Sequence, residues 1–347
     1  MPADAWNDMD APTPNQWAAL LRCFILLLCM AGAALMDHWQ RRVPNDWWIR
    51  WGVAIGFLLL VEVVLLDADA SLILATFGIL AWCSASVIGT PSLNDIRNGS
   101  KIDICVAAWY LFGIAGAGMS LYLHGPNALW SLNLAVDAPM FNLTDLEAIE
   151  IAENRGRLLL YLIGLAVGIV FIEIAWRARL LHGGADAKAM VVVALAIPWW
   201  SGIGPLGETT AVPPVISVLI WSALAFLILP FVTISRNLRT GHSGPLRMIW
   251  HAERWDLDRI PGHHVWILSE IVETADGERR VRERMRPRRK RVNSEDLAAQ
   301  IERLKDVGET SAWITKKHPF LVYVLPAIPL ALILGDPVAT ILHILGM

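Results

Sequence analysis

Residues 17–37 read WAALLRCFILLLCMAGAALMD, and this stretch indicates the kind of fold. About 20 mostly apolar residues form a helix roughly 30 Å long, which matches the hydrocarbon core of a bilayer. Residues 1–16 contain acidic side chains and no Lys or Arg, which is the wrong flank for a cleavable signal peptide. We therefore expect residues 17–37 to be a retained membrane helix.

Further apolar runs of similar length follow along the chain. A composition that is 55% hydrophobic and 18% charged, with a mean hydropathy of +0.48, is too apolar for an ordinary soluble domain. The sequence therefore predicts a polytopic α-helical membrane protein with about eight transmembrane helices. The predicted spans are residues 17–37, 48–66, 70–89, 102–123, 157–178, 186–204, 212–234 and 318–335.

The distribution of basic residues predicts the orientation. Of the 29 Lys and Arg residues, 18 lie in residues 235–317, and six more lie in alternate short loops. Because loops rich in Lys and Arg stay in the cytoplasm, we expect an extracytoplasmic N-terminus and a multi-pass protein of the cell membrane. The one exception among the loops is Arg155 and Arg157, which lie on the outer side before the fifth span. The six loop residues are Arg41, Arg42, Arg97, Lys101, Arg177 and Arg179.

The predicted chain has four parts. An extracytoplasmic tail, residues 1–16, precedes a membrane domain at 17–234, which includes an outer loop at 124–156. Residues 235–317 are expected to form a small α+β cytoplasmic subdomain, and residues 318–347 contain the C-terminal transmembrane helix and tail.

Within the subdomain, local patterns predict helices and a hairpin. Residues 244–255 are expected to form a short helix, and residues 265–273 and 279–285 to form strands. Asp276-Gly277 between them is a strong hairpin turn signal. Asn293 or Ser294 is expected to cap a helix that runs to about Asp306.

The cysteines argue against a metal or disulfide framework. Cys23, Cys29, Cys83 and Cys105 all lie in apolar runs, and none forms a C-x-x-C pair. We therefore expect no metal and no cofactor.

The basic segment at residues 235–317 indicates membrane topology first, rather than a nucleic-acid-binding surface.

Ionisable residues at membrane depth are costly and are candidates for function. Several of them have a simpler interpretation: Arg22 snorkels toward the outer surface, Glu62 lies near the outer end of its span, and Asp103 starts a helix. Glu173 can pair with Arg177 one turn later. The complete set is Arg22, Asp37, Glu62, Asp103, Glu173, Asp186 and Lys188.

Asp37 and Asp186 stand apart because both belong at cytoplasmic helix ends. Asp37 closes the first helix in the string MDHWQRRVPN, and Asp186 opens a later one in HGGADAK. Two neighbouring carboxylates cannot both stay ionised, so the pair shares a proton. One can then deprotonate a water while the other protonates the peptide group. The alternative is that both aspartates only cap helices.

The glycines before Asp186 favour the catalytic interpretation. Gly183 and Gly184 lack side chains where a substrate backbone has to come close, and Ala185 continues this small-residue string. An ordinary loop before a helix would have a similar composition, so a G-x-x-D string alone is a weak signal.

At these positions the sequence resembles the archaeal preflagellin and type IV prepilin peptidases, membrane aspartic peptidases of the GxGD group. In that family an aspartate at the end of the first helix is followed by a basic residue and an (I/V)-P-N string, as Asp37 is by residues 41–45 here. The second aspartate follows G-x-(hydrophobic) and often precedes Ala-Lys, as in residues 183–188. PGHHVW (residues 261–266) and KKHPFLV (residues 316–322) also resemble archaeal members.

The resemblance implies an activity and partners. It implies an Asp37–Asp186 dyad that cleaves the short basic leader from prepilin or archaellin precursors at the cytoplasmic face, with membrane lipid as the other partner and no nucleic acid. The aspartates are 149 residues apart, farther than in small members, and Ala185 replaces the last glycine of the motif. The four-cysteine zinc segment of bifunctional bacterial members is absent, so no methyltransferase activity is expected.

Other interpretations remain open from the sequence. A GxGD peptidase could act on other membrane substrates, although that group usually has Tyr where Met36 stands. An ion-coupled transporter could use intramembrane carboxylates, but such sites usually lie near the midplane between repeated halves. A non-enzymatic scaffold could dock an acidic partner or anionic lipid on residues 235–317. Lys188 either influences the protonation of the aspartate pair or is an interfacial lysine. Arg41 and Arg42 are expected only to set the membrane orientation.

Overall fold

The computed structural model describes residues 13–134, 145–181, 183–200, 212–241, 245–273, 279–285 and 294–345. The chain divides into two compact units. The helical unit comprises Met1–Ser222 and Phe320–Met347, and the mixed unit comprises Ala223–Pro319. Most of the N-terminal tail, the middle of the outer loop, the Asp276-Gly277 turn and Asn293 lie outside the described residues.

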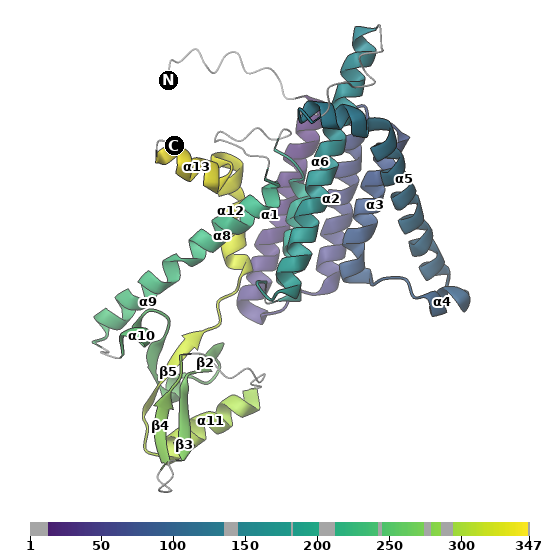
Figure 1. The fold of residues 1–347 in the computed structure, drawn as a ribbon. Coiled ribbons are helices and arrows are strands. Elements are labelled where there is room, and N and C mark those ends of the chain that lie inside the picture. Colours follow the sequence, from purple (N-terminus) through teal and green to yellow (C-terminus); the bar gives the residue numbers. More distant parts are fainter. Residues whose placement is uncertain are drawn as a thin grey trace. The chain divides into compact units, whose positions relative to one another are not determined.

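The helical unit is built from long apolar helices (Figure 1). α8 (Pro214–Phe226) leads from this unit into the mixed unit, where α9 (Ile228–Arg239) follows. The other helices of the unit are α1 (Pro14–Gln40), α2 (Asn45–Leu65), α3 (Ala70–Ile88), α4 (Leu93–Arg97), α5 (Lys101–Ser131), α6 (Leu146–Arg177), α7 (Gly184–Ala196), α12 (Leu321–Leu334) and α13 (Pro337–Ile344).

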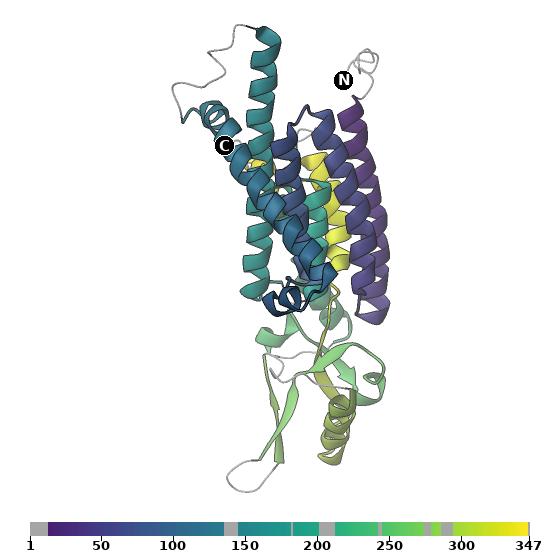
Figure 2. The same cartoon turned by 90° about the vertical axis from the view of Figure 1, so that its right-hand side faces the viewer.

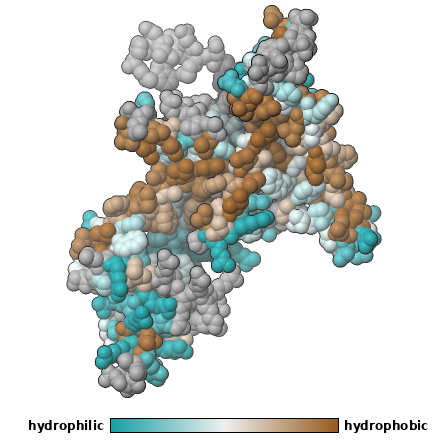
Figure 3. Space-filling view, viewed as in Figure 1, coloured by the Kyte–Doolittle hydropathy of each residue, from teal (hydrophilic) through white to brown (hydrophobic). Residues whose placement is uncertain are grey.

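α1 contacts three other helices of the unit. It packs against α2, α7 and α12, while α2 also packs against α3 and α7. Figure 2 shows the yellow α12 near the purple α1. Leu26, Met30, Ile55 and Leu59 are completely buried between these helices. Large apolar side chains remain exposed on the outside of the unit, where brown residues cover much of its surface (Figure 3). Such a surface is typical of helices that face lipid.

Close contact between α3 and α5 depends on glycine. A Cβ atom on Gly113 would lie 2.2 Å from Cα of Gly78, and one on Gly116 would lie 2.4 Å from Cβ of Leu74. Small residues at helix interfaces let backbones approach closely where no hydrophobic effect drives association. The two helices therefore pack backbone to backbone along this seam.

The prediction of eight spans is wrong in number. Within the described ranges, α1, α2, α5, α6 and the α8–α9 stretch are long and apolar enough to cross a membrane. α12 and α13, bent by 58°, make a sixth if they count as one broken span. The predicted span at 70–89 yields a shorter apolar helix, Ala70–Ala85 among the residues assessed. The predicted span at 186–204 yields only α7, which ends at Ala196 because Pro198 disfavours helical geometry at the preceding residue.

The mixed unit carries an antiparallel sheet and a separate hairpin. β1 (Glu253–Asp256), β5 (Ser311–Lys316) and β2 (Val265–Ile267) pair in the order β1-β5-β2. β3 (Ser269–Glu273) pairs with β4 (Arg279–Glu283), with Ile271 opposite Val281. The hairpin prediction is therefore confirmed, except that Leu268 divides its first strand into β2 and β3.

One face of the three-stranded sheet holds the core of the mixed unit. Ala312 and Ile314 of β5 pack there with Val265 and Ile267 of β2 and with the predicted helix, α11 (Ser294–Asp306). The prediction of a helix at 244–255 is wrong for most of its length. Only α10 (Leu246–Ile249) is helical, because residues 253–256 pair with β5 instead, and a short 3-10 turn, η3 (Leu257–Arg259), follows.

Candidate functional site

Asp37 lies in the last turn of α1, where the chain turns sharply. Arg41 adopts a left-handed conformation (φ 54°), and its N–H donates to the carbonyl of Asp37 at 3.2 Å. This αL cap ends the helix, and Pro44 then leads into α2. The carboxylate of Asp37 is half-buried, and the backbone N–H of Leu321 at the start of α12 donates to it.

Asp186 lies in the first turn of α7 and caps it. Its Oδ2 accepts a hydrogen bond from the backbone N–H of Gly183 at 2.9 Å. Carboxylates are favoured at helix N-termini because they satisfy free N–H groups and complement the helix dipole. The side chain is half-buried, so it remains partly accessible.

The two glycines before Asp186 differ in their surroundings. A Cβ on Gly183 would lie 2.8 Å from Oδ2 of Asp186, so a side chain at this position would have to displace the capping carboxylate. A Cβ on Gly184 would meet nothing within 4 Å. Ala185 packs against the buried core. The predicted role of these residues in substrate approach stays a prediction, and for Gly183 the structure gives a second, local reason.

Contacts between helices bring both aspartates to one end of the helical unit. Nζ of Lys188 on α7 donates to Oδ1 of Asn45, the first residue of α2, at 2.7 Å. The C-terminus of α1 and the N-termini of α2, α7 and α12 therefore meet. We call this region the Asp37 end and define it by Asp37, Asn45, Asp186 and Leu321. The catalytic role of Asp37 and Asp186 remains a prediction.

Two buried donors at the Asp37 end lack partners among the described residues. They are Nε of Arg41 and Nε1 of Trp48, one turn into α2. Partial burial lowers the pKa of the Arg41 guanidinium, while Asp37 and Tyr323 act in the opposite direction. The interpretation of Arg41 as a topology residue is therefore incomplete, since it also lies beside Asp37. Only its spacing of four residues from Asp37 could have indicated this.

A second polar cluster lies at the opposite end of the helical unit. Arg22 and Glu62 form an ion pair in which both side chains are 1% exposed. Nε1 of Trp199 donates to the other carboxylate oxygen of Glu62 at 3.1 Å, and Tyr161 stacks on Trp199 with ring centroids 5.5 Å apart. We call this the Arg22 end. The expectation that Arg22 snorkels is wrong, because its guanidinium turns inward to Glu62.

The same end holds a hydrogen-bonded chain between α3 and α5. His124 Nε2 lies 2.9 Å from Oδ2 of Asp69, Ser71 donates to Oδ1 at 2.8 Å, and Ser120 donates to Ser71. Burial acts to raise the pKa of Asp69, but hydrogen bonds from the Leu72 N–H, Ser71 and His124 outweigh it and hold the pKa below its usual value. Asp69 thus serves as a helix cap that is locked to α5.

Other ionisable residues fit their simpler interpretations. Asp103 lies in the first turn of α5 and accepts from Ser100 Oγ at 2.6 Å. Glu173 pairs with Arg177 at 3.6 Å and also accepts from Nε1 of Trp82 at 2.9 Å. The described part of the chain contains no group of three His, Cys, Asp or Glu side chains arranged to hold a metal. All four cysteines are free.

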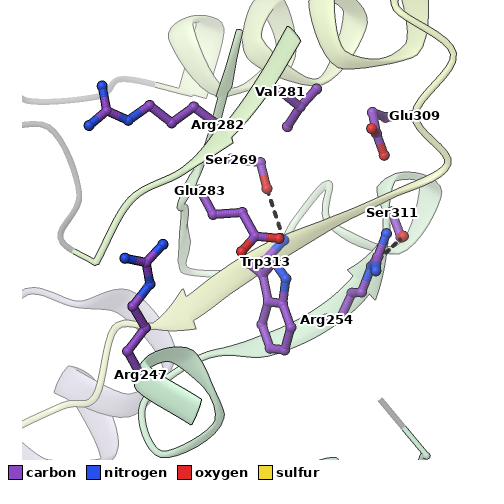
Figure 4. A pocket seen from close by; sticks show the side chains of 9 residues that line it. All are labelled: Arg247, Arg254, Ser269, Val281, Arg282, Glu283, Glu309, Ser311 and Trp313. Atoms are coloured by element: carbon purple, nitrogen blue, oxygen red, sulfur yellow. Dashed lines mark hydrogen bonds between the residues drawn. The ribbon is translucent and has the colours of Figure 1, made fainter. Parts of the chain in front are cut away.

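The mixed unit has a pocket of about 450 Å³ of its own (Figure 4). It lies on the sheet face opposite the α11 core, where Trp313 points, and β4 and α10 supply other walls. Arg247 and Arg254 flank the carboxylate of Glu283 in this view, and Arg254 is tied to Ser311 at 2.9 Å. Arginines and glutamates mix in the lining, so its charge singles out no ligand.

Comparison with known proteins adds no relative to this description. A scan against protein-family models finds no match for the chain, and a search of curated proteins finds none either. The site therefore rests on the residues themselves and on the resemblance of their motifs.

Proposed function

We propose that this chain is a membrane aspartic endopeptidase of the prepilin and preflagellin peptidase type. Asp37 and Asp186 form its catalytic dyad. Its substrates are precursors that carry a short basic leader ahead of a hydrophobic helix, and the cut falls between the two. The observation that carries the proposal is that both carboxylates lie at the Asp37 end of the helical unit and that both are half-buried.

The chemistry needs two carboxyl groups and a water. When two carboxylates approach each other, like charge and partial desolvation keep one proton on the pair. The ionised member takes a proton from water, whose oxygen attacks the scissile carbonyl, and the protonated member donates to the leaving amine. The C–N bond breaks, and the leader leaves with a new carboxylate. No metal or covalent nucleophile is needed.

The orientation follows from charge. Loops with Lys and Arg assign the Asp37 end to the cytoplasmic side and the N-terminus to the outside. The mixed unit belongs on the cytoplasmic side as well, because it carries most of the basic residues. A precursor with a basic leader would reach the Asp37 end from the side on which such leaders are retained.

Cleavage of a co-expressed precursor tests the proposal. The wild-type chain is expected to shorten a prepilin-like precursor by its leader, whereas Asp37→Asn and Asp186→Asn leave it uncut. Asp46→Asn is the matched control, since Asp46 is an exposed carboxylate in the first turn of α2 at the same end. Unchanged cleavage by both dyad variants would exclude the dyad.

The rival functions predict different results. An ion-coupled transporter would depend on a buried carboxylate such as Glu62, but Arg22 and Trp199 already occupy both of its oxygens. A scaffold that binds through the mixed unit would tolerate both dyad variants. A GxGD peptidase with other substrates would lose activity in both variants but would ignore the basic leader, so replacing the leader's Lys and Arg residues distinguishes it.

A further inference from the structure

The hydrogen bond between Lys188 and Asn45 links the two helices that follow the aspartates. Lys188 lies two residues after Asp186, and Asn45 begins the helix that follows Asp37. Their side chains meet at 2.7 Å across 143 residues of sequence. The contact lies at the surface of the helical unit, where Asn45 is exposed.

Hydrogen bonds and packing hold the α1–α2 turn, and with it Asn45, against α1. Nε1 of Trp47 donates to the carbonyl of Cys29 on α1 at 3.3 Å, and the Trp47 N–H donates to Pro44 at 3.2 Å. Gly32 leaves room for the indole, since a Cβ there would lie 2.5 Å from the Trp47 ring. Asn45 is thereby held at a fixed place relative to Asp37.

α7 is less constrained by packing near its start. Ala185 and Ala187 are small, only partly buried contacts with the core, and small side chains interlock weakly. The Gly183 cap fixes Asp186 relative to α7. Because α7 is almost entirely buried from Ala189 onward, only its first turn has room to move. A shift of that turn would carry Asp186 with it, and misplacement of about 1 Å can cost on the order of 100-fold in rate.

We propose that Lys188 and Asn45 are positioning residues, which together clasp α7 to the α1–α2 turn and set the separation of Asp37 and Asp186. This inference rests on the proposed function for its kinetic consequence. Its geometric consequence, a fixed distance between two helix ends, is independent of any activity.

Kinetics of precursor cleavage test the first consequence. Lys188→Met and Asn45→Ala are each expected to lower kcat by about 10- to 100-fold with little change in KM, because chemistry rather than binding is affected. The double variant should be no slower than either single one, since both remove the same contact. Lys188→Arg and Asn45→Asp retain a donor and an acceptor and should retain most activity. Lys101→Met, at the start of α5, controls for loss of a lysine at a helix N-terminus.

Distance measurements test the second consequence. Spin labels at His38→Cys and Gly184→Cys report on exposed neighbours of the two aspartates, in a Cys105→Ser background because Cys105 is the exposed native cysteine. The full chain should give a narrow distance distribution that Lys188→Met broadens and Lys101→Met does not.

The two tests separate the two ideas. A distribution that is equally narrow with and without Lys188 overturns the clasp, whatever the activity, and so does wild-type cleavage by Lys188→Met. If the distribution broadens in Lys188→Met but wild-type protein never cuts a precursor, the clasp stands and the proposed function is overturned.

Discussion

The two ends of the helical unit treat their carboxylates in opposite ways. At the Arg22 end, Glu62 is completely buried, paired with a guanidinium and hydrogen-bonded to an indole. At the Asp37 end, Asp37 and Asp186 are half-buried, and each accepts a hydrogen bond from a backbone N–H group. A carboxylate whose oxygens are both committed to buried partners can hold helices together but is closed to substrate. The Arg22 end is therefore structural, and the Asp37 end is the one that fits the proposed chemistry.

Neutralising a carboxylate at the Asp37 end should therefore change rate and not stability. Asp37→Asn and Asp186→Asn are expected to lower cleavage by at least about 1,000-fold, since each removes an acid or base of the dyad. Asn still caps helices, so the thermal midpoint should move little. Parallel melting curves and cleavage rates check this, and a large loss of stability would mean that these aspartates are structural too.

Neutralising the carboxylate at the Arg22 end should do the reverse. Glu62→Gln leaves a buried guanidinium without its counter-charge, which costs about 3–5 kcal/mol. Denaturant unfolding in detergent measures the loss. The double variant Arg22→Met/Glu62→Leu should recover much of it, because no uncompensated charge remains. A wild-type unfolding curve for Glu62→Gln would contradict the structural role of the pair.

The neighbouring glycines allow a finer test within the Asp37 end. Gly183→Ala places a methyl group 2.8 Å from Oδ2 of Asp186 and should displace the capping carboxylate. The expected cost is about 1 kcal/mol of stability with a drop in cleavage of about 10-fold. Gly184→Ala meets nothing within 4 Å and serves as the matched control for stability, while its cleavage rate reports on the predicted substrate approach. Equal losses of stability from the two substitutions would show that the cap does not hold Asp186.

A third carboxylate, that of Glu253 in the mixed unit, is only partly buried but accepts hydrogen bonds from charged side chains. Burial acts to raise the pKa of Glu253, but hydrogen bonds from Lys316, Trp255 and Arg236 outweigh it, so the pKa lies below its usual value. A lowered folded pKa stabilises the fold above the ordinary glutamate pKa of about 4.3, and this stability is lost as pH falls through the folded pKa.

The expected contribution of Glu253 to stability is about 1–2 kcal/mol, with no effect on cleavage. Hydrogen exchange in β1 and β5 of the full chain, compared between wild type and Glu253→Gln, measures it. The variant should exchange faster at neutral pH, and the difference should vanish below the folded pKa of Glu253. A difference that does not depend on pH would exclude the ion-pair explanation.

Sequence patterns predict where helices and strands lie better than they predict which of them contact each other. Apolar runs of membrane length correctly locate α1, α2, α5, α6 and the α8–α9 stretch. They overestimate the number of spans because the helix at 70–85 is short and because α7 stops before Pro198. Residues 253–256 pair with β5, which begins 55 residues later, and such long-range pairing overrides local helical preference.

The same distinction between local position and long-range contact applies to the candidate site. Asp37 and Asp186 are recognisable because their position at helix ends follows from local sequence. The pairing of Arg22 with Glu62 and of Lys188 with Asn45 depends on how helices are rotated about their axes, 40 and 143 residues apart. Nothing in a single sequence specifies that rotation, so Arg22 is misread as a surface residue and Asn45 is overlooked.

The most direct test of the dyad uses purified protein in lipid vesicles with a synthetic precursor that contains a basic leader and a hydrophobic helix. Mass spectrometry identifies the products. The account predicts one cut between leader and helix by wild type and Asp46→Asn, with no product from Asp37→Asn or Asp186→Asn while all four proteins stay folded. Absence of cleavage by folded wild-type protein, or the same product from both dyad variants, would contradict it.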